Sequence, residues 1–341
     1  MVSIGGAVAP PLAATTTVFS SSGTTPFIHA RRFNATTGWG TKYANPATLP
    51  PGNSLTVAYK PGVVMTASIT TPFLAAYPWN DVTGFGARYA TLSPAPTGTV
   101  VAAGFNATGT AVVGVLSASP WVFAYAWSDV TGFGARYATP DLTGIAGNSN
   151  SCSISPDNKA FAFTTSTSPW IYVFPWDDVA GFGARYANPS VLPNAARNNN
   201  VAFSPSSSVI IASGTGTPNL SAYAWNSITG FGTAYAAPAE IATSGRISFS
   251  ADGLAVVSCS STNPGLQGWQ WSDVTGFGTK FTSVNLPVTG GAPTLDGAAV
   301  VANDSATPFI QGWPFNSTTG FGTRYSAPTP AGTATAWVAS N

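Results

Sequence analysis

The chain has 341 residues and a formal net charge of +1, and charged residues make up only 7% of it, against roughly 25% in an average soluble domain. A balanced charge argues against a nucleic-acid interface, which needs a basic stripe. The 12% aromatic content argues against disorder. Gly, Pro, Ser and Thr interrupt each apolar run before it reaches the ~18 residues of a membrane helix. We therefore expect a soluble β-rich protein without nucleic-acid binding or membrane insertion.

The N-terminal segment has no Lys or Arg before Arg31, and Pro10 and Pro11 interrupt its apolar stretch. A secretory signal needs a basic region followed by 7–15 uninterrupted apolar residues. We expect no signal peptide and therefore synthesis in the cytoplasm, with residues 1–14 forming an N-terminal arm.

One phrase recurs along the chain. DVTGFGARYA stands at 81–90 and again at 129–138, DVAGFGARYA stands at 178–187, and looser copies occur elsewhere. The copies follow one another at intervals of 44 to 49 residues, so seven units fill the chain. An aromatic anchor begins each copy: Phe33, Trp79, Trp127, Trp176, Trp225, Trp271 and Phe315. A glycine follows each anchor five residues later: Gly38, Gly84, Gly132, Gly181, Gly230, Gly276 and Gly320.

Each unit predicts four short strands. In the fourth copy these are SCSIS, KAFAFTTS, WIYVFPW and FGARYA, separated by turns rich in Pro, Asp and Asn. Four antiparallel strands repeated every 40–50 residues are typical of a β-propeller blade. We predict an all-β, seven-bladed propeller of four-stranded antiparallel blades over residues 15–341. The anchors should pack between blades, and the glycines should take positive φ at the turns.

The two ends of the chain predict how the ring closes. The first copy lacks an innermost strand, because residues 15–22 resemble a second strand. Residues 333–340, TATAWVAS, resemble the inner strands of other copies. We expect this C-terminal segment to join the N-terminal blade, which removes the open edge of a sheet.

The repeats resemble two groups of known propellers. FSPSS from Phe203 and FSADG from Phe249 resemble the inner-strand ends of WD-repeat-like propellers. The pattern P-F-[IL]-x-[AG]-[YW]-x-[WF], followed by G-F-G-[AT]-[RK]-Y-[AS], resembles a repeat of propeller proteins encoded by tailed bacteriophages. This resemblance implies a non-enzymatic virion protein, structural, decorating or adhesive, located on the particle. Its partners would be capsid or tail proteins, a host-surface glycan, or further copies of itself.

Two other classes of protein compete with that interpretation. A lectin-type propeller would bind glycans by stacking sugars on exposed aromatic residues. A propeller hydrolase would need a central cluster of acids or histidines, which the sequence does not reveal. His29 is the only histidine and occupies a variable column, and Cys152 and Cys259 stand too far apart to suggest a disulfide. These three residues cannot supply a zinc site. We expect no catalytic residue, metal or cofactor.

The charged residues form two columns in the repeat. Asp81, Asp129, Asp178 and Asp273 follow their anchors by two residues, where an aspartate usually caps its own turn. A base follows seven residues later in most copies, and these bases are the candidate binding residues: Lys42, Arg88, Arg136, Arg185, Lys280 and Arg324. Ala234 interrupts this column. The column forms either a cationic ring for an acidic partner or a set of stems packed on aromatic rings with locally paired heads, which we favour.

The loops differ in how strictly they repeat. The blade-to-blade links and the second-to-third-strand loops vary, whereas the turns of the DVTG type are uniform. Variable loops on a rigid scaffold are where binding usually resides, so we expect ligands on the face that carries the links.

Overall fold

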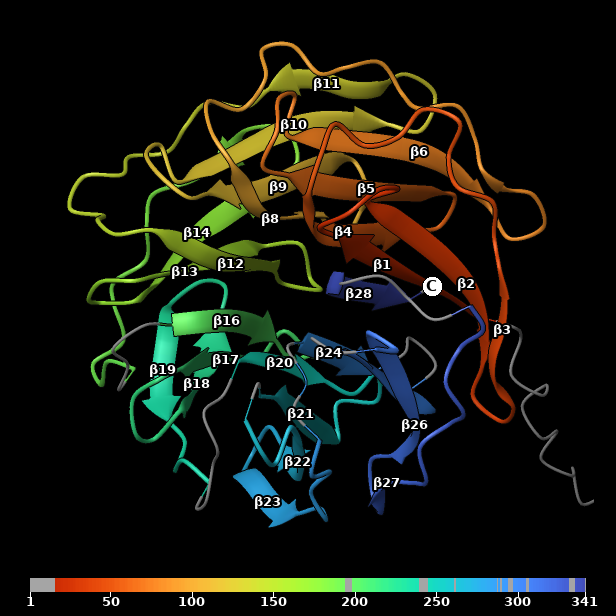
Figure 1. Ribbon diagram of the computed structural model, residues 1–341. Coiled ribbons are helices and arrows are strands. Elements are labelled where there is room, and N and C mark those ends of the chain that lie inside the picture. Colours follow the sequence, from red (N-terminus) through yellow and green to blue (C-terminus); the bar gives the residue numbers. More distant parts are fainter. Residues whose placement is uncertain are drawn as a thin grey trace, which may run out of the picture.

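The computed structural model describes residues 16–193, 198–238, 245–260, 262–286, 288, 290–293, 297–304, 307–330 and 335–340. Seven four-stranded antiparallel sheets are arranged as blades around a common centre (Figure 1). The predicted all-β, seven-bladed propeller is confirmed. The N-terminal arm expected at residues 1–14 lies outside the described residues. No helix long and apolar enough to span a membrane occurs in the part of the chain described.

Each blade contains an innermost, a second, a third and an outer strand. The innermost strands of blades 1 to 7 are β28 (Thr335–Ser340), β4 (Ser54–Lys60), β8 (Val100–Phe105), β12 (Ser149–Ile154), β16 (Asn198–Phe203), β20 (Arg246–Phe249) and β24 (Gly290–Pro293). The second strands are β1 (Thr16–Ser22), β5 (Val63–Ser68), β9 (Ala111–Leu116), β13 (Ala160–Thr165), β17 (Val209–Gly214), β21 (Ala255–Cys259) and β25 (Ala299–Asn303).

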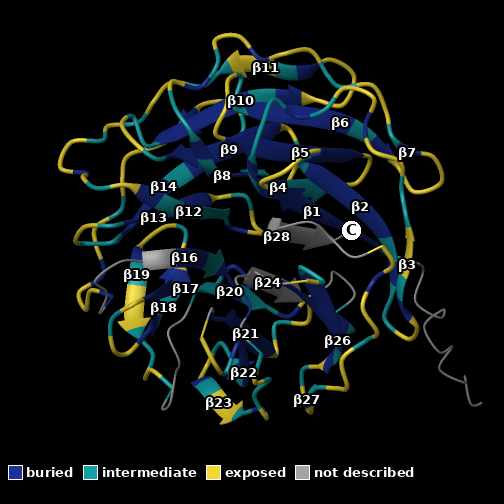
Figure 2. Ribbon diagram, viewed as in Figure 1, coloured by how far each residue is buried: buried dark blue, intermediate teal, exposed yellow. Residues whose placement is uncertain are grey.

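The third strands contain the aromatic anchors. They are β2 (Ile28–Asn34), β6 (Leu74–Asn80), β10 (Val122–Ser128), β14 (Ile171–Asp177), β18 (Leu220–Asn226), β22 (Leu266–Ser272) and β26 (Ile310–Asn316). The outer strands are β3 (Gly38–Lys42), β7 (Gly84–Phe85), β11 (Gly132–Arg136), β15 (Gly181–Phe182), β19 (Gly230–Ala234), β23 (Gly276–Lys280) and β27 (Gly320–Phe321). Burial is concentrated in the second and third strands, whereas the outer strands combine a buried glycine with intermediate and, in the longer ones, exposed residues (Figure 2).

The C-terminal strand closes the ring as predicted. In blade 1, β28 pairs antiparallel with β1, so that Val18 faces Ser340 and Phe19 faces Ala339. The first blade is therefore built from both ends of the chain. A second link crosses the same closure, because the Tyr325 hydroxyl donates a hydrogen bond to the main-chain oxygen of Ala35.

The hydrophobic core lies between blades. Trp127 is buried among residues of blades 2 and 3, in edge-to-face contact with Phe133 and with Tyr89 of the preceding blade, each at a centroid distance of 5.0 Å. The other six anchors are buried as well. Truncating such a side chain costs about 3–5 kcal/mol, so burial of the anchors between blades is expected to stabilise the ring.

The same phrase recurs because its residues contact one another across each blade boundary. Gly181 has φ of +81°, and a Cβ placed there would lie 2.9 Å from Cδ1 of Tyr137 in the preceding blade. The Tyr137 hydroxyl donates a 2.6 Å hydrogen bond to the main-chain oxygen of Asp178. The glycine and the tyrosine of the phrase therefore fit each other from neighbouring blades, and the predicted positive φ holds for all seven glycines.

The aspartate column has a different role from the one expected. The turn amides of Val179 and Ala180 donate to Asp177, not to Asp178. Asp178 instead accepts two hydrogen bonds: one of 2.8 Å from the indole Nε1 of Trp176, and one of 2.6 Å from the Thr108 hydroxyl of the preceding blade. Burial opposes ionisation of this carboxyl, but these hydrogen bonds outweigh it and lower its pKa to about 2. The column therefore joins neighbouring blades.

Candidate functional site

The candidate cations of the outer strands lie against aromatic rings. The Arg185 guanidinium lies 5.3 Å from the ring centroid of Tyr172, and its Nη1 donates 3.5 Å to the main-chain oxygen of Thr143. Lys280 Nζ lies 5.9 Å from the ring of Trp269. These contacts match the favoured arrangement of stems on aromatic rings.

Two of the remaining bases have local hydrogen-bond partners. Arg88 Nη1 donates a hydrogen bond of 3.1 Å to the main-chain oxygen of Leu49, and Arg324 Nη1 donates one of 2.7 Å to Gln311 Oε1. In the backbone register Arg136 stands opposite Tyr125, and Lys42 stands opposite Arg31, a like charge that, after burial, lowers the pKa of Lys42. The structure does not bring these six residues together into one site.

The aspartates do not pair with the bases of their own repeats. Among the described residues, the one ion pair joins Lys60 Nζ to Asp129 Oδ1 at 2.6 Å, from blade 2 to blade 3. The expectation of Asp–Arg pairing within a repeat is therefore wrong. The Trp indoles bind the carboxylates in place of the bases, because each Trp stands two residues from its aspartate whereas the base stands seven residues away.

His29, Cys152 and Cys259 do not form a reactive cluster. His29 is buried in β2, and burial together with Lys42 and Arg31 lowers its pKa to about 4. Both cysteines are free, and burial raises the pKa of each to about 12. In the described part of the chain, no three His, Cys, Asp or Glu side chains come together.

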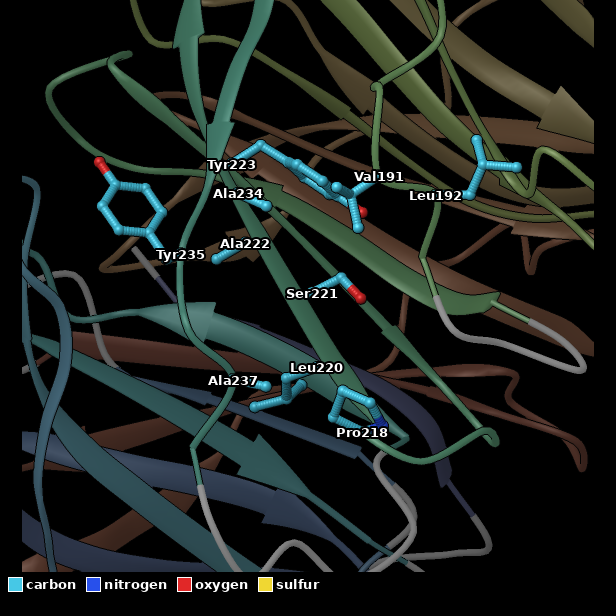
Figure 3. Close-up of a pocket in the computed structure, with 10 residues that line it drawn as sticks. All are labelled: Val191, Leu192, Pro218, Leu220, Ser221, Ala222, Tyr223, Ala234, Tyr235 and Ala237. Atoms are coloured by element: carbon cyan, nitrogen blue, oxygen red, sulfur yellow. The ribbon is translucent and has the colours of Figure 1, made fainter.

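A cavity of about 200 Å³ opens where the repeat is interrupted in blade 5 (Figure 3). It lies beside Ala234, in the column that holds Lys or Arg in the other blades. Val191 and Leu192 of the preceding link, Pro218, Ser221 and Tyr223 are among its lining residues, as Figure 3 shows. None of the residues lining this cavity in the described structure is charged.

The cavity contains a hydroxyl pair on its wall. Burial raises the pKa of Tyr223 to about 12, and a hydrogen bond with Ser221 opposes that shift only partly. Tyr223 therefore remains neutral and cannot act as a base near pH 7. The blade-5 cavity, as we call it, is suited to binding a ligand and not to acid–base chemistry.

A second polar site lies on the innermost strands of blades 4 to 6. Ser151, Asn200 and Arg246 occupy one level, because they pair with equivalent positions of the second strands: Thr164, Ser213 and Cys259. Asn200 Nδ2 donates 2.9 Å to Ser151 Oγ, and its Oδ1 accepts 3.3 Å from the amide of Ile247. We call Ser149, Ser151, Asn200 and Arg246 the inner polar belt.

Arg246 is the charged member of this belt. It begins β20, and its side chain is half-buried. Burial lowers its pKa to about 9, while the neighbouring Cys259 acts in the opposite direction. A desolvated cation that is still partly open to solvent is a common feature of functional sites.

One hydroxyl of the belt and one on the neighbouring second strand β13 have no hydrogen-bond partner in the protein. Ser149 Oγ and Thr164 Oγ1 are buried and have no hydrogen-bond partner in the protein. Buried polar atoms are normally satisfied, so a water molecule or a ligand hydroxyl would complete them. The spacing of the repeats does not indicate this site, because Arg246 lies outside the repeated phrase, in a column with Thr56, Ala102, Ser151 and Asn200.

Comparisons with known proteins identify the fold. No family model matches the chain, and no curated protein matches it. A putative 6-phosphogluconolactonase from Bacteroides fragilis matches with a TM-score of 0.75 at 12% identity, covering 98% of this chain and all of its own. A putative 6-phosphogluconolactonase from Bacteroides uniformis has a TM-score of 0.74 at 13% identity, covering 96% and 99%.

A third match extends the same pattern. The periplasmic gluconolactonase PpgL of Pseudomonas aeruginosa has a TM-score of 0.69 at 12% identity, covering 92% of this chain and 96% of its own. Such identities establish a shared fold alone. The seven-bladed propeller is thus common to all of these proteins, over nearly their whole lengths.

These matches contradict the expectation of a non-enzymatic virion protein. Three structures that align with this chain over nearly its whole length are named as lactonases, two of them as putative ones, and none of the three is named as a phage or WD-repeat protein. The expectation failed because the repeated phrase describes how blades pack and not what the ring does. The lectin alternative needs exposed anchors, and all seven anchors are buried.

Proposed function

We propose that this protein is a propeller hydrolase that opens small cyclic esters, namely lactones, at the inner polar belt. Arg246 is the observation that carries the proposal: a half-buried cation on an innermost strand, with desolvation acting on it. The end-to-end likeness to propellers named as lactonases supports the same reaction class.

Hydrolysis of a lactone requires stabilisation of one developing negative charge, on the carbonyl oxygen. Water attacks the carbonyl carbon of the lactone, the carbonyl oxygen becomes an oxyanion, and the bond to the ring oxygen then breaks. The proton from water ends on the released alkoxide, which leaves a hydroxy acid. The Arg246 guanidinium donates to the oxyanion, and a preorganised donor in a partly desolvated site typically contributes a 10²–10³-fold acceleration.

The rest of the belt favours a hydroxylated substrate. Ser149 and Thr164 each hold a buried hydroxyl without a protein partner, whereas the Asn200 amide is already hydrogen-bonded to Ser151 and to the amide of Ile247. Ligand hydroxyls satisfy such atoms without leaving a buried polar group unpaired. Lactones of sugar acids fit this requirement better than plain aliphatic lactones.

Acid release from a panel of sugar-acid lactones and aliphatic lactones tests the proposal. We expect hydrolysis above the spontaneous rate, with preference for hydroxylated lactones, and a loss of about 100-fold in kcat/KM for Arg246→Met. Arg185→Met is the control, since that arginine lies on the outer part of blade 4. Equal activity of both variants would mean that the reaction takes place away from Arg246. A native protein without lactonase activity would contradict the proposed function.

A further inference from the structure

Blade 5 lacks the Lys or Arg side chain that the other blades have at the corresponding position of the repeat. In blade 3, Arg136 pairs across the sheet with Tyr125, and in blade 6, Lys280 pairs with Trp269. The same register in blade 5 places Ala234 opposite Tyr223. The aromatic partner is therefore retained while the cation is missing.

Blade 2 shows what the missing side chain does. Arg88 hydrogen-bonds the Tyr77 hydroxyl and donates 3.1 Å to the main-chain oxygen of Leu49 in the link before the blade. Residue 75, two positions before Tyr77, is a small alanine, which leaves room for an arginine stem. Blade 5 matches this arrangement, with Tyr223 and the small Ser221 at the same two positions.

The consequence is the blade-5 cavity. Its volume of about 200 Å³ far exceeds the ~15 Å³ that a single water needs. Residues 191 and 192 of the link before blade 5 line it, as the link before blade 2 supplies the Leu49 acceptor. The cavity thus keeps an aromatic ring and a neighbouring link, which are two of the features that hold Arg88.

We propose that the blade-5 cavity binds the side chain of an arginine from a partner peptide segment, which takes the place that Arg88 occupies in blade 2. Arg185 lies on the ring face of Tyr172 and donates a hydrogen bond to a main-chain oxygen, and Arg88 also donates to a main-chain oxygen. An uncharged lining is therefore compatible with a guanidinium ligand. This site is separate from the inner polar belt and does not depend on the proposed hydrolase activity.

The rim of the cavity favours a peptide over a free amine. Val191 is 60% exposed and Leu192 is 40% exposed, and both line the opening. A small free guanidinium would leave this apolar surface uncovered, whereas apolar residues beside an arginine would bury it. Apolar neighbours around a cation inserted in a pocket are a common arrangement at peptide interfaces.

Calorimetric titration with acetyl-Leu-Arg-Leu-amide tests the inference. We expect it to bind about tenfold more tightly than acetyl-Leu-citrulline-Leu-amide, which is isosteric but uncharged, because a cation over an aromatic face contributes roughly this much. Agmatine, a free alkylguanidinium, should bind more weakly than the peptide. Equal affinity for the arginine and citrulline peptides would overturn the guanidinium assignment, and agmatine binding as tightly as the peptide would overturn the peptide assignment.

Two matched variants locate the site. Ala234→Arg supplies the missing cation from within and should abolish peptide binding, whereas Thr233→Arg adds the same charge at the exposed neighbouring position and should preserve it. Arg88→Ala should open the matching cavity in blade 2 and create binding of agmatine there. If Ala234→Arg binds the peptide unchanged, or if Arg88→Ala gains no agmatine binding while remaining folded by thermal unfolding, the inference is wrong.

Discussion

The hydroxyl of Tyr137 donates a hydrogen bond across a blade boundary to the main-chain oxygen of Asp178, at 2.6 Å. Equivalent bonds join Tyr43 to Asp81 and Tyr89 to Asp129, at 2.6 and 2.7 Å. At the boundary between blades 6 and 7 the tyrosine is replaced by Phe281, which cannot donate. The ring is therefore held by a repeated tyrosine contact with one natural omission.

The tyrosine contact predicts a reciprocal pair of stability changes. Tyr137→Phe should lower the free energy of unfolding by about 1 kcal/mol, because a main-chain acceptor loses its donor. Phe281→Tyr should raise it by up to about 1 kcal/mol by supplying the missing donor. Urea denaturation measures both, and the contact has no energetic role if neither variant differs from the native protein.

The glycine of the phrase should resist substitution. Gly181→Ala combines φ of +81° with a Cβ 2.9 Å from Tyr137, so we expect a loss of about 2–4 kcal/mol. In a Tyr137→Ala background the steric part should disappear and roughly 1 kcal/mol of backbone strain should remain. A double-mutant cycle measures the coupling, and strictly additive losses would contradict the contact.

Ring closure predicts the effect of a C-terminal truncation. Deleting residues 335–341 removes β28 and exposes the edge of β1 that pairs with it. We expect a lower melting temperature and a tendency to aggregate, because an unpaired edge strand invites pairing with other chains. An unchanged melting temperature for the truncated chain would show that β28 does not hold blade 1 in the ring.

Arg246 should lower stability in the native protein at neutral pH. Burial lowers its pKa to about 9 in the folded state, below the 12.5 of an exposed arginine, so the folded state disfavours the charged form. The resulting penalty is fully present below pH 9 and declines as the pH rises above it. Arg246→Met should therefore raise the free energy of unfolding by about 1–3 kcal/mol at pH 7.

The pH dependence provides the check on that explanation. The gain from Arg246→Met should shrink in unfolding curves recorded above pH 9, while the gain from an ordinary packing improvement would not. Loss of stability in the variant at pH 7 would mean that the arginine is well compensated. A residue that costs stability and is retained is consistent with a functional role.

The sequence predicts the scaffold well because the scaffold is repetitive. Seven copies of one packing problem make the anchors, the turn glycines and the C-terminal closing strand visible in the spacing of residues alone. The roles of Asp178 and its equivalents were less accessible, since the competing donors Trp176 and Thr108 are brought together only by the turn and by the neighbouring blade.

Both candidate sites lie where the repetition fails. Ala234 was visible as an interruption of the cation column, but the cavity beside it also depends on Val191 and Leu192 of the preceding link, which line it together with Tyr223. Arg246 belongs to an innermost strand outside the repeated phrase, and the belt around it is assembled from strands of blades 4, 5 and 6. The periodicity of the sequence predicts the residues that all blades share, but it does not predict the role of a residue that occurs in only one blade.

The most direct test of the proposed activity is the rate of acid release from δ-gluconolactone at pH 6.5, measured in a pH-stat against increasing protein concentration. The proposal predicts a rate that rises linearly with protein, saturates with substrate, and returns to the spontaneous value for Arg246→Met. A rate equal to spontaneous hydrolysis at every protein concentration, for this lactone and for its 6-phosphate, would contradict it.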